Sequence, residues 1–176
     1  MKTLILCEGP NELEVIRILM RNNLLKYSEE DLIGLTPFHA RQLGFPQIKL
    51  ELNIYTEEFD VILIGDTQND SFKIPKEYKD RIVSVKKYCT KPELEMLLII
   101  SENLTKEYEK VKSRVAPKEF AKGNIVYNRK RYKNDTEFYS HYYGSRPELL
   151  CKAIQTYAKI KKHKKDEGYL VELLKN

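Results

Sequence analysis

The sequence predicts an α/β fold with a mostly parallel central sheet, because short hydrophobic runs alternate with segments of helical periodicity. We expect about four largely parallel strands with helices on both faces, followed by a helical C-terminal extension. With 176 residues, of which 41% are hydrophobic, the chain suits a single domain with a substantial core. We divide it into an α/β core at residues 1–112 and a basic, mainly helical extension at residues 113–176 that packs on the same domain.

The start of the chain predicts a strand, a tight turn and a helix, which form the first part of a βαβ unit. Residues 2–7 are short and apolar, and Gly9 and Pro10 end the strand. Asn11 is a candidate N-cap of the helix, because its side chain can accept a backbone N–H group. Apolar residues recur at helical spacing from there to about residue 25.

The middle of the chain predicts two more strands and two helices. The strands are expected at residues 60–65 and 81–85, the helices at residues 47–55 and about 93–112 after Pro92, and a further candidate strand at residues 32–36. In the extension, residues 113–135 read as irregular and basic, and helices are expected at residues 149–163 and 170–174.

The composition argues against a membrane protein or a disulfide-bonded secreted protein. No apolar run approaches the roughly 20 residues of a membrane span, and the first residues carry no small-residue cleavage site. We therefore expect no membrane association and a cytoplasmic location. The three cysteines are odd in number and form no C-x-x-C pair, which favours reduced thiols over disulfides or a zinc site.

Charge is distributed unevenly along the chain. Residues 1–80 hold 9 basic and 14 acidic residues, whereas residues 81–176 hold 22 basic and 12 acidic residues. An acidic first part and a basic second part suit a metal site beside a surface that binds a polyanion. The alternative is that the basic helices are simply solvated and have no nucleic-acid partner.

Acidic residues follow two predicted strands at the points where the strands end. Glu8 comes directly after the first strand, and Asp66 directly after the strand at residues 60–65. Because ligands of open α/β sheets bind beyond the carboxyl ends of the strands, we expect both carboxylates at one edge. Glu12, one helical turn after Glu8, and Asp70, in the loop after Asp66, can reach the same place.

Oxygen ligands of this kind suit Mg²⁺ or Mn²⁺, and therefore phosphoryl chemistry. Glu8 has few packing reasons to stand directly after an apolar strand. Two structural alternatives stay open for the other acids. Glu12 is also explained as an acid favoured by the helix dipole, and the segment from Asp66 to Asp70 as an Asx-type turn.

Three motifs surround these acids. Residues 8–12 read Glu-Gly-x-x-Glu after an apolar strand. The later strand is followed by Asp66, which stands where an Asp-x-Asp motif would begin. Residues 92–95 read Pro-x-x-Glu before an apolar helix. Together they resemble the Toprim domain superfamily over roughly residues 2–100. The Cys-Glu-Gly stretch at residues 7–9 is similar to its small stand-alone branch, which includes RloB-like proteins and nucleases of the overcoming-lysogenisation-defect class.

The resemblance implies a Rossmann-like Toprim core and a role for individual acids. The implied catalytic residues are Glu8 and Asp66, and the implied metal ligands are Glu8, Glu12, Asp66, Gln68, Asp70 and Glu95. Gln68 stands where the family has its second aspartate, so it offers a neutral oxygen, and Asp70 substitutes only if the loop bends. In the later element we prefer Glu95 to Glu93, because an acid in the first helical turn is already favoured by the dipole.

By this resemblance, we expect a Mg²⁺-dependent (or Mn²⁺-dependent) nuclease or related phosphodiester-processing protein of the bacterial or phage defence type. Its substrate would be DNA or RNA, and a partner protein such as an ATPase is compatible with that role. Because Gln68 replaces an aspartate, the alternative is a catalytically degenerate module that binds nucleic acid or a partner protein. A third interpretation is activity on small phosphoesters.

Basic residues in the second part of the chain are candidates for holding a nucleic-acid backbone. One group is Lys86, Lys87 and Lys91, and the other is Arg129, Lys130, Arg131 and Lys133, interleaved with Tyr127 and Tyr132. Cations and aromatic rings together suit phosphate neutralisation and base stacking, and a plain solvated loop is the alternative for the second group. His141 is a candidate for proton transfer.

Overall fold

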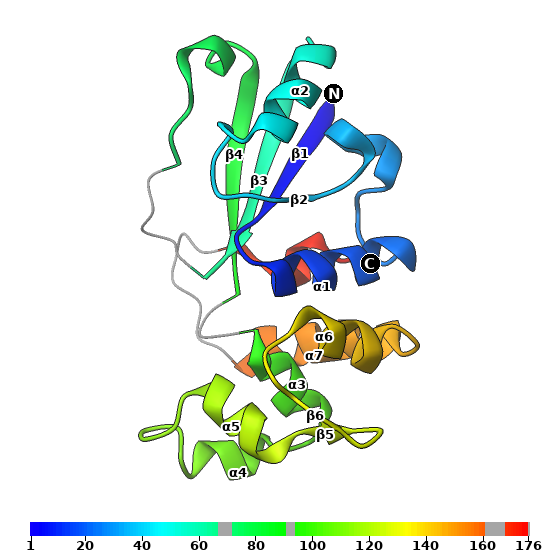
Figure 1. The fold of residues 1–176 in the computed structure, drawn as a ribbon, viewed down its shortest axis with the longest axis vertical. Coiled ribbons are helices and arrows are strands. Elements are labelled where there is room, and N and C mark those ends of the chain that lie inside the picture. The colour runs from blue at the N-terminus through cyan, green and yellow to red at the C-terminus, as the bar shows by residue number, and fades with distance from the viewer. Residues whose placement is uncertain (67–71, 91–93, 161–167, 176) are drawn as a thin grey trace.

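The chain forms a five-stranded parallel sheet with helices on both of its faces (Figure 1). The computed structural model describes residues 1–66, 72–90, 94–160 and 168–175. In sheet order, the strands are β2 (Phe38–His39), β1 (Lys2–Cys7), β3 (Phe59–Gly65), β4 (Ile82–Cys89) and β7 (Gly168–Tyr169). The predicted α/β class and parallel sheet are therefore confirmed, with one strand more than expected.

Some helices cover the faces of this sheet, and others form a group beyond the carboxyl ends of its strands (Figure 1). The α-helices are α1 (Pro10–Arg21), α2 (Pro46–Ile54), α3 (Glu95–Ser101), α4 (Thr105–Glu109), α5 (Pro117–Asn124), α6 (Thr136–Tyr143) and α7 (Pro147–Ile160). The 3₁₀ helices are η1 (Glu29–Asp31), η2 (Ile33–Leu35), η3 (Lys76–Tyr78) and η4 (Leu170–Leu173), and a hairpin joins β5 (Val126–Tyr127) to β6 (Lys130–Arg131). No helix in the described ranges is long and apolar enough to cross a membrane.

Alternate residues of β1 pack on opposite faces of the sheet, as a strand requires. Ile5 and Cys7 belong to the larger core, which is formed with α1, α3, α6 and α7. Leu4 and Leu6 belong to the smaller core, which is formed with α2 and Tyr78. Burial raises the pKa of the Cys7 thiol, so this residue is a packed, unreactive cysteine.

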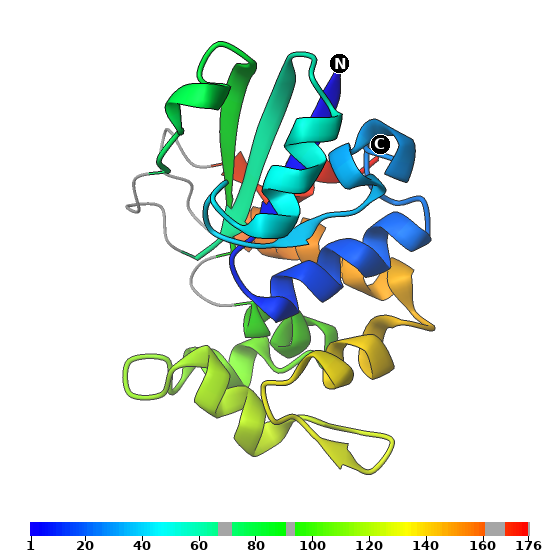
Figure 2. The same cartoon turned by 45° about the horizontal axis from the view of Figure 1, so that its top comes forward.

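The direction in which successive strands are added across the sheet reverses at β1, and this position matters for ligand binding. β2 lies on one side of β1 in parallel register, with Cys7 opposite His39, and β3 lies on the other side, with Cys7 opposite Ile64. Such a change of winding direction is a topological switch point, where open α/β sheets bind ligands. Figures 1 and 2 show the carboxyl ends of β1, β3 and β4 directed towards the helices that follow β4 in the chain.

Helix α1 begins one residue before the predicted N-cap. Pro10 occupies its first position, and Gly9 is the N-cap residue, which makes no side-chain hydrogen bond. The prediction of Asn11 as N-cap is therefore wrong, because the fixed φ of proline already suits the first helical position. The side chain of Asn11 instead contacts Asn134 and Thr136.

Three other local predictions were wrong. The candidate strand at residues 32–36 is the 3₁₀ helix η2 preceded by a single parallel bridge from Leu32 to Thr3. The strand that pairs with β1 on this side is β2, which is too short to give a sequence period. The single helix expected at residues 93–112 is two helices, since Asn103, with φ of 58°, ends α3 before α4 begins. Residues 113–135 are not irregular throughout, because they form α5 and the hairpin of β5 and β6.

Candidate functional site

Glu8 connects the ends of two neighbouring strands at the switch point. Its backbone N–H donates to the carbonyl of Ile64 over 2.8 Å, which continues the pairing of β1 with β3. Its side-chain Oε2 accepts a hydrogen bond from the backbone N–H of Asp66 over 3.1 Å, and its Oε1 forms an ion pair with Arg41 Nη2 over 3.1 Å. The predicted meeting of the two acidic strand ends is therefore present in the structure.

Glu12 and Asp66 show the electrostatic effect of this crowding. Burial raises the pKa of the Glu12 carboxyl, and the negative charges of Asp66, Glu8 and Glu95 raise it further. Burial also raises the pKa of Asp66, and the hydrogen bond and charge of Glu8 add to that effect. Glu12 therefore lies within electrostatic reach of Glu8, Asp66 and Glu95, so four of the six predicted metal ligands gather around this carboxyl.

Two glycines leave the space that these carboxylates occupy. A Cβ atom placed on Gly65 would lie 2.6 Å from the Cβ atom of Glu8 and would also overlap its carboxylate. A Cβ atom on Gly9 would overlap the carboxylate of Glu12. The close approach therefore requires glycine at residue 65, whereas a Cβ atom on Gly9 would meet only the flexible end of Glu12.

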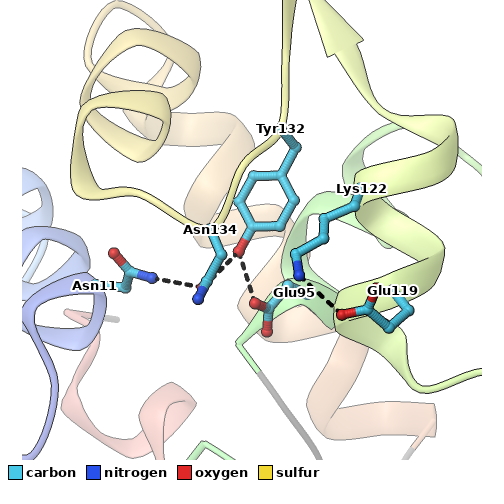
Figure 3. A network of polar contacts seen from close by, with 6 residues as sticks. All are labelled: Asn11, Glu95, Glu119, Lys122, Tyr132 and Asn134. Carbon is cyan, nitrogen blue, oxygen red and sulfur yellow. Dashed lines mark hydrogen bonds and ion pairs between the residues drawn. The ribbon is translucent and has the colours of Figure 1, made fainter.

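Glu95 is held by a network from the C-terminal part of the chain (Figure 3). It is the first residue of α3, so the reason for preferring it to Glu93 was wrong, because Glu95 itself lies in the first helical turn. Glu95 is 5% exposed, and its Oε1 accepts a 2.6 Å hydrogen bond from the buried hydroxyl of Tyr132. The amide group of Asn134 lies 3.1 Å from Tyr132 Oη and 3.1 Å from Asn11 Nδ2. With its amide nitrogen facing Glu95, Asn134 also donates to Oε1 over 3.2 Å and accepts from Lys118 over 2.8 Å.

We expect Tyr132→Phe to lower the free energy of unfolding by about 1–3 kcal/mol, because the buried Glu95 carboxylate loses a donor. Tyr143→Phe is the matched control, since its equally buried hydroxyl shares a 2.9 Å hydrogen bond with the neutral Ser101 hydroxyl. That control should cost about 0.5–1.5 kcal/mol. Urea unfolding of both variants measures the difference, and equal losses would contradict a special role of Tyr132 in holding Glu95.

Three of the predicted site residues cannot be placed. Gln68, Asp70 and Lys91 lie outside the described residues, as does Glu93, the competitor of Glu95. Lys86 and Lys87 lie within β4, opposite Ile62 and Leu63 of β3, so they precede the carboxyl end of the strand. Lys86 is exposed and Lys87 is half-buried.

The cations of the hairpin differ from one another in their surroundings. Lys130 bonds Glu137 over 2.6 Å, and Arg131 donates to the carbonyls of Lys122 and Gly123 at the end of α5. All four predicted cations, Arg129, Lys130, Arg131 and Lys133, are exposed. Within the parts of the chain that the structure describes, Arg129 and Lys133 make no ion pair, which leaves them available to an external anion.

The aromatic residues of this stretch are not arranged for stacking on bases. Tyr132 is 1% exposed, so its ring cannot meet an external base, and that expectation is wrong for this residue. Tyr127 is half-buried, and its ring is covered by the guanidinium of Arg146 at 4.1 Å from the ring centre. His141 packs against Tyr127 at 5.1 Å between ring centres, in an aromatic cluster of the helical part.

The oxygen-rich set at the switch point fits a hard divalent cation. Across residues 1–66, 72–90, 94–160 and 168–175, no three His, Cys, Asp or Glu side chains are already placed to enclose a metal ion. Mg²⁺, however, usually takes one or two protein carboxylates and completes its shell with waters and substrate phosphates. Glu8 and Asp66, which lie next to each other at this edge, would supply such a partial set of ligands.

The raised pKa values give a prediction about pH. Folding raises the pKa of the Glu12 and Asp66 carboxyls, so their protonation stabilises the folded state. This stabilisation is fully present at a pH below the ordinary carboxyl pKa of about 4, and it is lost as the pH rises through the raised pKa. At neutral pH the carboxylates repel one another, and a bound cation would offset the repulsion. We therefore expect Mn²⁺ at about 100 times its Kd to stabilise the fold by about 2.7 kcal/mol at neutral pH. The stabilisation by Mn²⁺ should be much smaller near pH 4.5. Thermal unfolding with and without Mn²⁺ measures it at both pH values. Equal shifts of the unfolding temperature at the two pH values would contradict the prediction.

Sequence reasoning missed the residues that surround the acids. Arg41 follows the two-residue strand β2, and Tyr132 and Asn134 reach the site from a part of the chain far from it in sequence. A basic residue in a loop and a tyrosine in a basic run carry no local signal of such contacts.

Comparison with known protein families, with curated proteins and with solved structures gives no match to this chain.

Proposed function

We propose that the protein is a Toprim-like, Mg²⁺- or Mn²⁺-dependent phosphodiester-processing protein that acts on nucleic acid. The observation that carries this proposal is the hydrogen bond of 3.1 Å from Asp66 N–H to Glu8 Oε2, which joins two acidic residues across the switch point. The sequence motifs at residues 8–12 and 92–95 support it independently. The basic second part of the chain supports a polyanionic substrate.

The acids have different roles in this proposal. Glu8 and Asp66 would hold the cation, and the Asp66 N–H would fix the Glu8 carboxylate in place. When bound, Mg²⁺ supplies Lewis-acid polarisation of the phosphate and lowers the pKa of an attacking water. Glu12, whose pKa is raised by burial, is suited to hold the proton that the leaving oxygen takes up. Tyr132 would act as a positioning residue through Glu95.

Cleavage assays test the proposal directly. The protein is incubated with plasmid and with single-stranded DNA and RNA in Mg²⁺ or Mn²⁺, beside Asp66→Asn. Asp80→Asn is the matched control, because Asp80 is an exposed aspartate just before the amino end of β4, at the opposite edge of the sheet. Cleavage that needs the cation and Asp66, but not Asp80, is the expected result. Cleavage that survives Asp66→Asn would overturn the assignment.

Binding to nucleic acid should depend on the unpaired hairpin cations. We expect the double substitution of Arg129 and Lys133 by alanine to reduce the slope of log K against log[salt] by about 2 for a labelled oligonucleotide. The same change at Lys76 and Lys79, two exposed lysines near the amino end of β4, should leave the slope unchanged. Fluorescence anisotropy over a series of salt concentrations measures both. An unchanged slope in the hairpin variant would remove this surface from the proposal.

A second candidate function is a binding module without catalysis. Gln68 in place of an acidic residue favours it, since a neutral ligand lowers the charge available to a second cation. Tight, salt-sensitive binding without cleavage of any polymer would support this alternative. Turnover of a small phosphoester that ignores the hairpin cations would instead support an activity on nucleotides or similar compounds.

A further inference from the structure

Arg41 is a basic residue in direct contact with the acidic site. Its Nη2 atom lies 3.1 Å from Oε1 of Glu8, while Oε2 of the same carboxylate accepts the Asp66 N–H. The side chain of Arg41 is 64% exposed and that of Glu8 is 15% exposed. The ion pair therefore joins a largely fixed carboxylate to a guanidinium that extends into solvent.

The backbone beside Arg41 is fixed by the sheet. Ala40 donates its N–H to the carbonyl of Cys7 over 3.0 Å, directly after the pairing of Cys7 with His39. On the other side, the side-chain Oε1 of Gln42 accepts a 3.0 Å hydrogen bond from the backbone N–H of Lys73. The backbone is therefore held by the sheet at Ala40, and the largely exposed side chain of Arg41 can change its position without moving it.

The surroundings of Glu8 determine what this guanidinium does. The other charged neighbours that affect Glu12 and Asp66 most are acidic, so Arg41 offsets part of a local excess of negative charge. A divalent cation at Glu8 would use the same carboxylate and would carry twice the charge. Because the guanidinium of this ion pair lies largely in solvent, the pair contributes little free energy, and the cation would displace the guanidinium readily.

We propose that Arg41 is a phosphate-binding residue that is released by the cation. Without the cation it neutralises Glu8, and with the cation bound it turns to a phosphate group at the same edge of the sheet. Guanidinium binds phosphate through paired N–H donors and keeps its charge at every working pH, which suits this exchange. The inference rests on the proposed function, since it assigns the cation to Glu8.

Mn²⁺ binding measured by titration calorimetry tests the first half of the exchange. We expect Arg41→Ala to bind Mn²⁺ about threefold more tightly than the unmodified protein, because the competing cation has been removed. Arg41→Lys should lie between the two. Arg21→Ala is the matched control, since Arg21 forms a similar ion pair of 2.9 Å, 58% exposed, with Glu14. Its affinity for Mn²⁺ should be unchanged.

Oligonucleotide binding tests the second half. With Ca²⁺ in place of Mn²⁺, and with the substrate checked for integrity afterwards, the unmodified protein should bind a labelled oligonucleotide several-fold more tightly than it does in chelator. Arg41→Ala should lose most of that increase, while Arg21→Ala should keep it. Coupling between two ligands is reciprocal, so the oligonucleotide should raise the affinity of the unmodified protein for Ca²⁺ by the same factor.

The outcomes separate this inference from the proposed function. If the unmodified protein binds Mn²⁺ and Arg41→Ala binds it equally or more weakly, the exchange is wrong and the cation site stands. If Arg41→Ala keeps the full effect of Ca²⁺ on oligonucleotide binding, Arg41 is not the phosphate-binding residue. If the unmodified protein binds no Mn²⁺, both the cation site and the exchange are wrong.

Discussion

Replacing Glu8 by glutamine is expected to lower metal-dependent cleavage on the order of 10³-fold and to leave the fold at least as stable. A bound cation supplies several kcal/mol of transition-state stabilisation, and the neutral amide would no longer hold it. The amide oxygen can still accept the Asp66 N–H, so the connection between the strands survives. Removing one of several repelling carboxylates offsets the loss of the exposed ion pair with Arg41.

Cleavage assays and urea unfolding of the same preparation measure both parts of this prediction. Glu58→Gln is the matched control, because Glu58 is an exposed glutamate directly before the amino end of β3, at the opposite edge of the sheet. It should change neither quantity. A Glu8→Gln variant that loses activity because it unfolds, or that cleaves normally, would contradict the role given to Glu8.

Substitution of Gly65 by alanine should impair the site without touching any of its carboxylates. The new Cβ atom would lie 2.6 Å from Glu8 Cβ, so Glu8 must move as a whole rather than by rotation of its end. A displacement of about 1 Å at a reacting group can cost about 10²-fold in rate. Overpacking of this kind also costs about 1–3 kcal/mol of stability.

The control for this change is Gly123→Ala in α5, where an added Cβ atom meets nothing within 4 Å. That variant should cleave normally and unfold at an equal or higher urea concentration, since alanine favours the helix by about 1 kcal/mol over glycine. The cleavage rates and the unfolding midpoints of the two variants check the prediction. Full activity of Gly65→Ala would show that Glu8 does not need its observed position.

The strands that carry the acids could be predicted because their signal is local. β1 and β3 contain the continuous apolar runs of residues 4–7 and 61–64, which is typical of strands buried on both faces, and each acid directly follows its strand. Parallel pairing then brings Glu8 and Asp66 to one edge with no further information. This argument does not place Glu95, because a helix start has no fixed position relative to the sheet. Only the family resemblance predicted Glu95 near the site.

The rest of the site depends on long-range contacts that no short pattern encodes. Tyr132 was expected to face nucleic acid, since it stands in a basic run, but burial of its ring and a hydrogen bond to Glu95 place it inside. Arg41 depends on β2, whose two residues are too few to show a period of two. Asn103 ends α3 through a left-handed backbone that the apolar pattern around it does not reveal.

The position of β7 has a consequence for the order in which the molecule can fold. β7 pairs with β4, yet all of α3 to α7 lie between them in the chain. The nearby backbone also closes on the beginning of the chain, with Lys26 donating to Leu173 and Lys175 donating to Leu24 over 2.9 Å each. Until these distant partners meet, the last two residues of β4, Tyr88 and Cys89, present an unpaired edge, which is a template for association with another chain. Shortened versions that stop before β7 should therefore aggregate during refolding even though they contain every acid of the site.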